Sequence, residues 1–82
     1  MSVTALERLS QMPEHTSVNI HAIQADVATR MRLLGMGLGK GSSIQILRNR
    51  WGDMVVGSGH NRISLGRSIT HDILVSTSTQ YT

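Results

Sequence analysis

Residues 32–46 read Arg-Leu-Leu-Gly-Met-Gly-Leu-Gly-Lys-Gly-Ser-Ser-Ile-Gln-Ile, and this stretch decides the fold. Gly37 fits the left-handed position just past the end of a helix, where a side chain would be penalised. Leu38 would then fold back onto Leu33, which is the apolar contact that accompanies a Schellman cap. Upstream, Asp26 is a good N-cap residue. The pattern therefore predicts a helix of about ten residues between Asp26 and Gly37, followed by a strand.

This helix is expected to dock on a sheet, because a helix of about ten residues is marginal alone in water. Val27, Met31 and Leu34 fall on one helical face, whereas Arg30 and Arg32 lie off it. We therefore expect the three apolar residues to form the docked face.

Alternating apolar and polar residues predict short strands on both sides of the helix. The alternation breaks after Ile46, because Arg48 and Arg50 share the parity of the preceding isoleucines, and a bulge or bend near Ile46–Leu47 would resolve the conflict. Five short strands with one helix predict a mainly β fold, a small partly open barrel. The expected segments are strands at 18–23, from 44 to a turn at Gly52-Asp53, at 54–58, after a turn at Gly59-His60-Asn61 to 65, and at 73–75, with one helical turn within 66–71.

The two ends of the chain give weaker signals. Thr4-Ala-Leu-Glu7 has the spacing of a capping box, which predicts a short N-terminal helical turn from about Thr4 to Leu9. Leu6 and Leu9 would then close one end of the core. Residues 76–82 are almost wholly Ser and Thr and are expected to be a disordered tail after a domain at 1–75.

Composition limits the classes of protein that remain. A chain of 82 residues is expected to be one compact domain or a fragment of something larger. Without cysteine it has no disulfide scaffold, thiolate metal site or cysteine nucleophile. The isoelectric point of about 10.7 rests on a net charge of only +3. Seven of the eight basic residues are Arg, so few groups titrate between neutrality and high pH, and a small excess of positive charge gives a high isoelectric point. No apolar run approaches the ~20 residues that span a bilayer, and the N-terminus lacks the pattern of a secretory signal. A soluble, intracellular protein is expected.

Catalytic motifs are not recognisable. Gly39-Lys40 suggests a phosphate loop, but Gly41 stands where that motif needs Ser or Thr. The order helix then strand is also the reverse of a phosphate loop. The five acidic residues are scattered, mostly at caps and turns, so no acid–base pair can be assigned. The sequence does not predict an enzyme.

Two clusters could still bind a ligand. His71-Asp72, with His60 near it across the barrel, could bind Fe²⁺ or Zn²⁺ weakly, although solvated surface histidines explain the same residues. Arg48-Asn49-Arg50-Trp51 is the one basic-aromatic cluster. Single-stranded nucleic acid binders use several stacking aromatics, so Trp51 covering a barrel end between solvated arginines is the favoured interpretation.

The stretch 32–38, followed by Gly41 and the alternating strand 43–46, resembles the signature of the ferrous iron transport protein A (FeoA) family. Segments within 62–75 match the closing part of that family, and the resemblance covers about residues 18–75. Gly57 and Gly59 depart from the family pattern, which predicts a short or loosely paired third strand. The signature positions are Arg32, Leu33, Gly37, Leu38 and Gly41.

The resemblance implies a small SH3-like β-barrel of the bacterial cytoplasm, with the short α-helix between its first two strands. Such proteins accompany FeoB, a large membrane ferrous transporter with a cytoplasmic GTPase domain, and are thought to bind it and modulate uptake. The same barrel occurs as the C-terminal domain of iron-dependent repressors, so a nucleic-acid-binding or metal-sensing regulatory domain is the alternative. We expect a docking module whose contact candidates are Met36, Leu38, Trp51 and Met54, with Arg48 and Arg50 at a polar rim. The alternative is that Met36 and Leu38 are core residues, and for Leu38 the core is the favoured interpretation.

Overall fold

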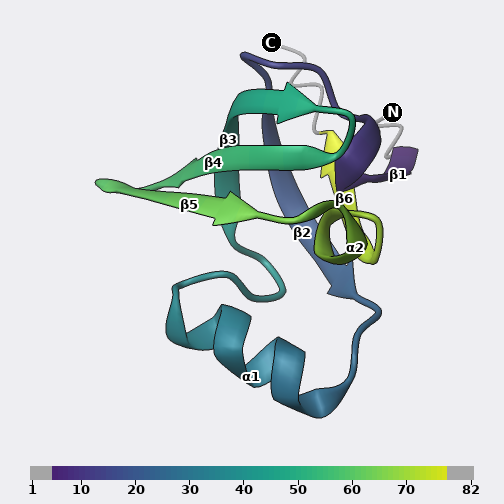
Figure 1. Cartoon of the computed structure of the whole chain (residues 1–82), viewed down its shortest axis with the longest axis vertical. Helices are drawn as coiled ribbons and strands as arrows, with labels where there is room; N and C mark the ends of the chain where they lie inside the picture. The colour runs from purple at the N-terminus through teal and green to yellow at the C-terminus, as the bar shows by residue number, and fades with distance from the viewer. Residues whose placement is uncertain (1–4, 78–82) are drawn as a thin grey trace, which may run out of the picture.

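Antiparallel strands make up most of the computed structural model, which describes residues 5–77 (Figure 1). One sheet has the strand order β1-β6-β2-β3-β4-β5, and its β3–β4–β5 part crosses in front of β2. The mainly β prediction is confirmed, with six strands in place of five. The elements are β1 (Ala5–Arg8), the 3-10 turn η1 (Leu9–Gln11), β2 (Ser17–Ile23), α1 (Val27–Gly35), β3 (Ser43–Arg50), β4 (Asp53–Ser58), β5 (Asn61–Leu65), α2 (Arg67–Thr70) and β6 (Ile73–Thr77).

One face of each strand builds a single apolar core. The pattern buries every second residue through most of the sheet, as period-2 side-chain alternation requires. The expected bulge is present, because the β3–β4 register shifts between Ile46 and Arg48. The fully buried core side chains are Leu9, Leu38, Ile46, Val56, Ile73 and Val75.

The N-terminal segment differs from the prediction. Residues 5–8 form strand β1, which pairs with β6 from Ala5↔Thr77 to Arg8↔Leu74. The capping-box prediction is therefore wrong over these residues, because pairing with a distant strand outweighs a local helical preference. Leu9 is buried as expected, but Leu6 is 47% exposed. Thr4 lies outside the described residues.

The C-terminal end of the domain also differs from the prediction. Strand β6 continues to Thr77, two residues past the expected end of the domain, because Ser76 and Thr77 pair with β1. Residues 78–82 of the expected tail lie outside the described part of the chain.

The hairpin β4–β5 is regular, so the expectation of a loosely paired strand is wrong. Gly57 pairs with Gln45 on one side and Arg62 on the other. Its missing side chain leaves room for Leu47, whose Cδ1 would be 3.4 Å from a Cβ at Gly57. Gly59 has φ +60° and supplies the turn into β5.

The end of α1 is the Schellman cap predicted above. Gly37 has φ +88°, and its N–H donates to Leu34 O at 2.9 Å. The Leu38 N–H donates to Leu33 O at 2.9 Å, and both leucines are buried in the core. The Asp26 cap is also confirmed, because its Oδ1 accepts from the Thr29 N–H at 2.8 Å.

Candidate functional site: an apolar groove beside α1

Helix α1 exposes the apolar face that was expected to dock on the sheet. Val27 and Met31 are each 63% exposed, and Leu34 is 59% exposed. Leu33 is the one buried residue of α1, so the docking prediction named the wrong face. Leu33 and the cap residue Leu38 attach the helix, which leaves the other apolar face open to solvent (Figure 1).

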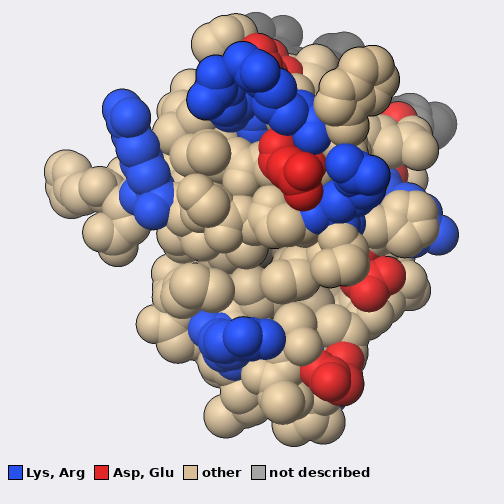
Figure 2. All heavy atoms as spheres, in the orientation of Figure 1, with Lys and Arg blue, Asp and Glu red and all other residues tan. Residues whose placement is uncertain are grey.

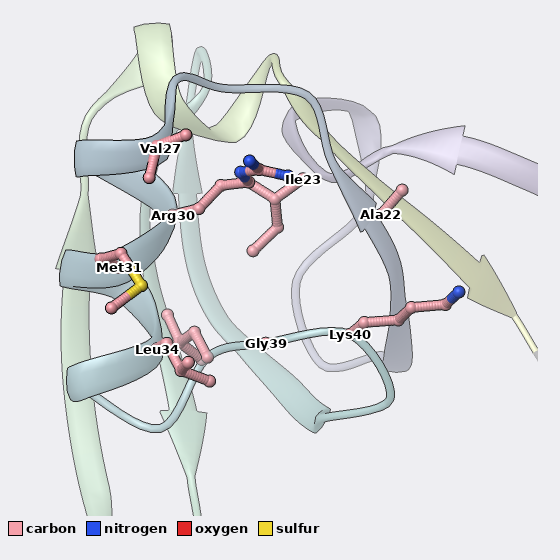
Figure 3. Close-up of a pocket in the computed structure, with 9 residues that line it drawn as sticks. Ala22, Ile23, Val27, Arg30, Met31, Leu34, Gly39 and Lys40 are labelled. Atoms are coloured by element: carbon pink, nitrogen blue, oxygen red, sulfur yellow. The ribbon is translucent and has the colours of Figure 1, made fainter.

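This exposed face forms one wall of a groove of about 340 Å³. The opposite wall comes from Ala22 and Ile23 at the end of β2, and Gly39 and Lys40 close one side. Figure 3 shows the α1 side chains and Ile23 on the two sides of the open space, with Arg30 reaching from the helix toward Ile23. The groove is therefore apolar along its walls and has a cation on each side.

The loop after α1 holds the groove in shape. The Ser42 hydroxyl donates to Gly37 O at 3.1 Å and accepts from the Gly39 N–H at 3.0 Å, and the Gly41 N–H donates to Ile20 O at 2.7 Å. A Cβ at Gly39 would lie 2.9 Å from Leu34 Cδ1. Glycine at this position therefore lets Leu34 lie directly over the loop, and a side chain there would displace it.

Charge around the groove favours an acidic ligand. Arg30 and Lys40 line it, and both are exposed. The nearby carboxyl of Asp26 is occupied by its cap: hydrogen bonds from the Thr29 side chain and N–H, and then the charges of Arg32 and Arg30, lower its pKa. The groove thus suits a segment whose apolar side chains are flanked by carboxylates.

The contact residues predicted from the sequence do not form one surface. Leu38 and Met54 are buried in the core, at 0% and 2% exposure, so neither side chain is available to a partner. Met36 is exposed after the C-terminus of α1, whereas the β3–β4 turn that carries Trp51 lies at the other end of the molecule (Figure 1). Trp51 is 88% exposed, so the interpretation that it covers a barrel end is wrong. Arg48 and Arg50 are exposed on β3, next to the turn that carries Trp51.

The predicted metal ligands are not assembled either. His60 lies in the β4–β5 turn, while His71 and Asp72 follow α2 on the opposite side of the sheet (Figure 1). Within residues 5–77, no group of three His, Asp or Glu side chains is placed to hold a metal ion. The ligand set His60, His71 and Asp72 is therefore not formed in this structure.

Figure 2 shows how charge is distributed over one face. Basic side chains gather over the strand end of the molecule with acidic side chains between them, and a smaller basic group lies over α1. Among the residues that the structure describes, one ion pair is formed, Arg67 to Asp53 at 3.7 Å. Both partners are more than 60% exposed, so this pair adds little stability.

Asn49 has a role that the sequence did not reveal. Its Nδ2 donates to Ser10 O at 3.1 Å and to Met12 O at 2.8 Å, and its Oδ1 accepts from the Gly52 N–H at 3.0 Å. The side chain therefore joins η1 to the β3–β4 turn. The sequence offered one signal for this role: Asn49 alternates with Arg48 and Arg50, so after the bulge it lies on the inward side of β3. A polar side chain on that side needs a hydrogen-bond partner.

None of the helices in the described part of the chain combines the length and apolar character that crossing a membrane requires.

The model of the FeoA domain family matches residues 7–77. A protein assigned as an Fe(2+) transport protein A from Methanocaldococcus jannaschii is 29% identical over 62 residues, which are 76% of each chain.

Two solved structures extend the comparison. The FeoA of Stenotrophomonas maltophilia in complex with zinc is described as a prokaryotic SH3 domain protein and a candidate ferrous iron transport activating factor. It is 27% identical, with a TM-score of 0.69 over 92% of this chain and 88% of that one. A manganese-dependent transcriptional repressor has a TM-score of 0.81 over 92% of this chain and 43% of its own, at 18% identity. The second likeness shows the fold alone, and together the two establish the SH3-like architecture predicted above.

Proposed function

Because the chain belongs to the FeoA family, we propose that it is a cytoplasmic accessory protein that binds and modulates a FeoB-type ferrous iron transporter. The groove between α1 and β2 would be its docking site. The observation that carries this proposal is the helix face of Val27, Met31 and Leu34, which is well over half exposed at each position.

Monomeric proteins rarely expose several apolar side chains together on one face, and such patches commonly mark interaction sites. Here the three side chains face a second apolar wall, so a partner would bury them on both sides. Burial of one methionine or leucine side chain is worth about 1.5–3 kcal/mol. A partner that fills the groove would therefore gain most of its affinity from two or three side chains.

The expected occupant is a segment of the transporter's cytoplasmic region that carries apolar residues between acidic ones. Arg30 and Lys40 would pair with its carboxylates at the rim of the groove, where they mainly set orientation and association rate. No catalytic step is assigned to the protein in this proposal. Modulation would come from binding alone, through preference for one state of the transporter.

Binding of the purified transporter cytoplasmic region, measured by calorimetry, tests the proposal. Met31→Glu should weaken binding about tenfold or more, because it removes a buried methionine and places a carboxylate between two apolar walls. Ala28→Glu is the matched control, since Ala28 is exposed on the same helix but does not line the groove. Equal affinities for the two variants would exclude the groove, and no binding by the unmodified protein would refute the proposed partner.

A further inference from the structure

Trp51 occupies a backbone position that is unfavourable for its side chain. Its φ is +57° and that of Gly52 is +96°, so these two residues form the turn between Arg50 and Asp53. Positive φ at both central residues is the type I′ pattern, which prefers Asn-Gly. A left-handed residue with a Cβ costs roughly 1–2 kcal/mol.

Packing does not repay this cost. Trp51 is 88% exposed, and it is absent from the residues that line the described depressions on the surface. A large aromatic residue in strained backbone with most of its surface exposed indicates a role outside the fold.

The turn is held rigidly in place. The Gly52 N–H donates to Asn49 Oδ1 at 3.0 Å, and Gly52 O accepts from the buried Thr70 hydroxyl at 2.6 Å. Asp53 Oδ1 accepts from the Arg67 N–H at 2.8 Å. The indole is therefore presented by a prearranged turn, which lowers the entropic cost of binding.

Two arginines beside the turn are available for an anionic partner. Arg48 and Arg50 are exposed on β3, and in residues 5–77 neither forms an ion pair. Two carboxylates lie nearby: Asp53 is engaged by Arg67, and Glu14 Oε2 accepts from the Asn49 N–H at 2.8 Å and lines the same depression as both arginines. Figure 2 shows that basic side chains outnumber the acidic side chains between them over this end of the molecule.

We propose that Trp51, Arg48 and Arg50 form a contact surface for an anionic lipid bilayer. Tryptophan favours the membrane–water interface, where its ring is apolar and its N–H reaches the headgroups. Arginines close to an anionic leaflet each add about 1 kcal/mol of attraction. Trp51 is 88% exposed and lines none of the described depressions, so it suits a soft interface better than it suits a peptide or a base that needs a groove.

This contact goes beyond the proposed docking function and does not depend on it. The α1 groove and the β3–β4 turn lie at opposite ends of a molecule 38 Å long (Figure 1). One end can therefore contact a bilayer while the other binds a protein segment. Simultaneous contact would raise the effective concentration of each partner for the other.

The fluorescence of Trp51 provides a site-specific test, because it is the single tryptophan of the chain. The protein is titrated with vesicles of phosphatidylglycerol mixed with phosphatidylcholine, and with vesicles of phosphatidylcholine alone. We expect a blue shift of the emission, and quenching by brominated acyl chains, with the anionic vesicles only. Arg50→Gln should lower the partition coefficient about fivefold, the factor that corresponds to about 1 kcal/mol per basic residue.

Two variants separate binding from folding. Trp51→Asn places the preferred residue in the turn, so it should raise the melting temperature and abolish co-sedimentation with anionic vesicles. Arg32→Gln removes the same charge as Arg50→Gln from an exposed position on α1, and it should leave vesicle binding unchanged.

Three outcomes would overturn the proposal. One is the absence of an emission shift with anionic vesicles at low salt. The second is co-sedimentation of Trp51→Asn equal to that of the unmodified protein. The third is an emission shift with the transporter's cytoplasmic region or with single-stranded DNA and none with vesicles. Loss of the groove interaction through Met31→Glu would leave vesicle binding intact, so the two proposals fail independently.

Discussion

Replacement of Asn49 by alanine should lower the stability of the protein more than the half-buried position of this residue suggests. The side chain makes three hydrogen bonds, to Ser10 O, Met12 O and the Gly52 N–H. At about 1 kcal/mol net for each bond, Asn49→Ala should lower the free energy of unfolding by about 3 kcal/mol. The whole free energy of unfolding of a domain of 82 residues is about 4–12 kcal/mol. The melting temperature should therefore fall by about 12–24 °C.

Thermal and urea unfolding followed by circular dichroism measure this effect. Asn61→Ala is the matched control, because Asn61 is exposed and its loss should cost less than about 0.5 kcal/mol. Asn49→Asp keeps the acceptor for Gly52 but loses both donors, so it should destabilise the protein at least as much at neutral pH. A loss below about 1 kcal/mol for Asn49→Ala would refute the reasoning, because it would mean that water replaces all three bonds.

Two glycine substitutions near the end of α1 should change the stability in opposite directions. Gly37→Ala should destabilise the protein by about 1 kcal/mol because φ is +88°. Gly35→Ala should stabilise it by about 0.5–1 kcal/mol, because Gly35 lies within α1 and has open space around it. Urea midpoints compare the two: no loss of stability in Gly37→Ala would contradict the cap, and a loss in Gly35→Ala would contradict the benefit of alanine within α1. Asp26 has a lowered pKa because Thr29 donates to it, so its contribution to stability is complete above the ordinary value of 3.8 and is lost as the pH falls through the lower folded value. Asn can cap the helix without titrating. The difference in melting temperature between Asp26→Asn and the unmodified protein should therefore change as the pH falls below 3.8. A difference that is constant with pH would argue against the cap.

Local signals in the sequence predicted local structure well. The positive φ at Gly37, the Asp26 cap and the bulge after Ile46 each depend on residues within a few positions of one another. Such features follow from backbone sterics and hydrogen bonding inside one short segment. They were therefore readable before any tertiary contact was known.

Features that depend on distant pairing were not predictable in this way. Strand β1 exists because residues 5–8 pair with residues 74–77, and nothing local distinguishes that strand from a capped helical turn. Periodicity showed that α1 has an apolar face, but it could not show which side the core would take. Leu33 was assigned to the cap, and the cap residues Leu33 and Leu38 proved to be the attachment.

The candidate site was only partly within reach of sequence reasoning. Trp51, Arg48 and Arg50 were contact candidates, and each is exposed. The favoured interpretation of Trp51 as the cover of a barrel end was wrong. Leu38 and Met54 were contact candidates because they lie near the helix end and the hairpin tip, although the core was the favoured position for Leu38. An apolar residue at such a place can lie on either side of a sheet. The side that it takes is set by register, which only the pairing of strands determines.

The place of β6 in the sheet has a kinetic consequence. This strand lies between β1 and β2, so the last described strand of the chain supplies the centre of the N-terminal half of the sheet. On the ribosome, β1 would wait for residues about seventy positions later and β2 for residues at least 50 positions later, and contacts of such separation make folding slow. Until Thr77 emerges, both earlier strands present open hydrogen-bonding edges, which are templates for aggregation. Folding of this small domain should therefore depend on chaperones, until residues 73–77 are available, more than its size suggests.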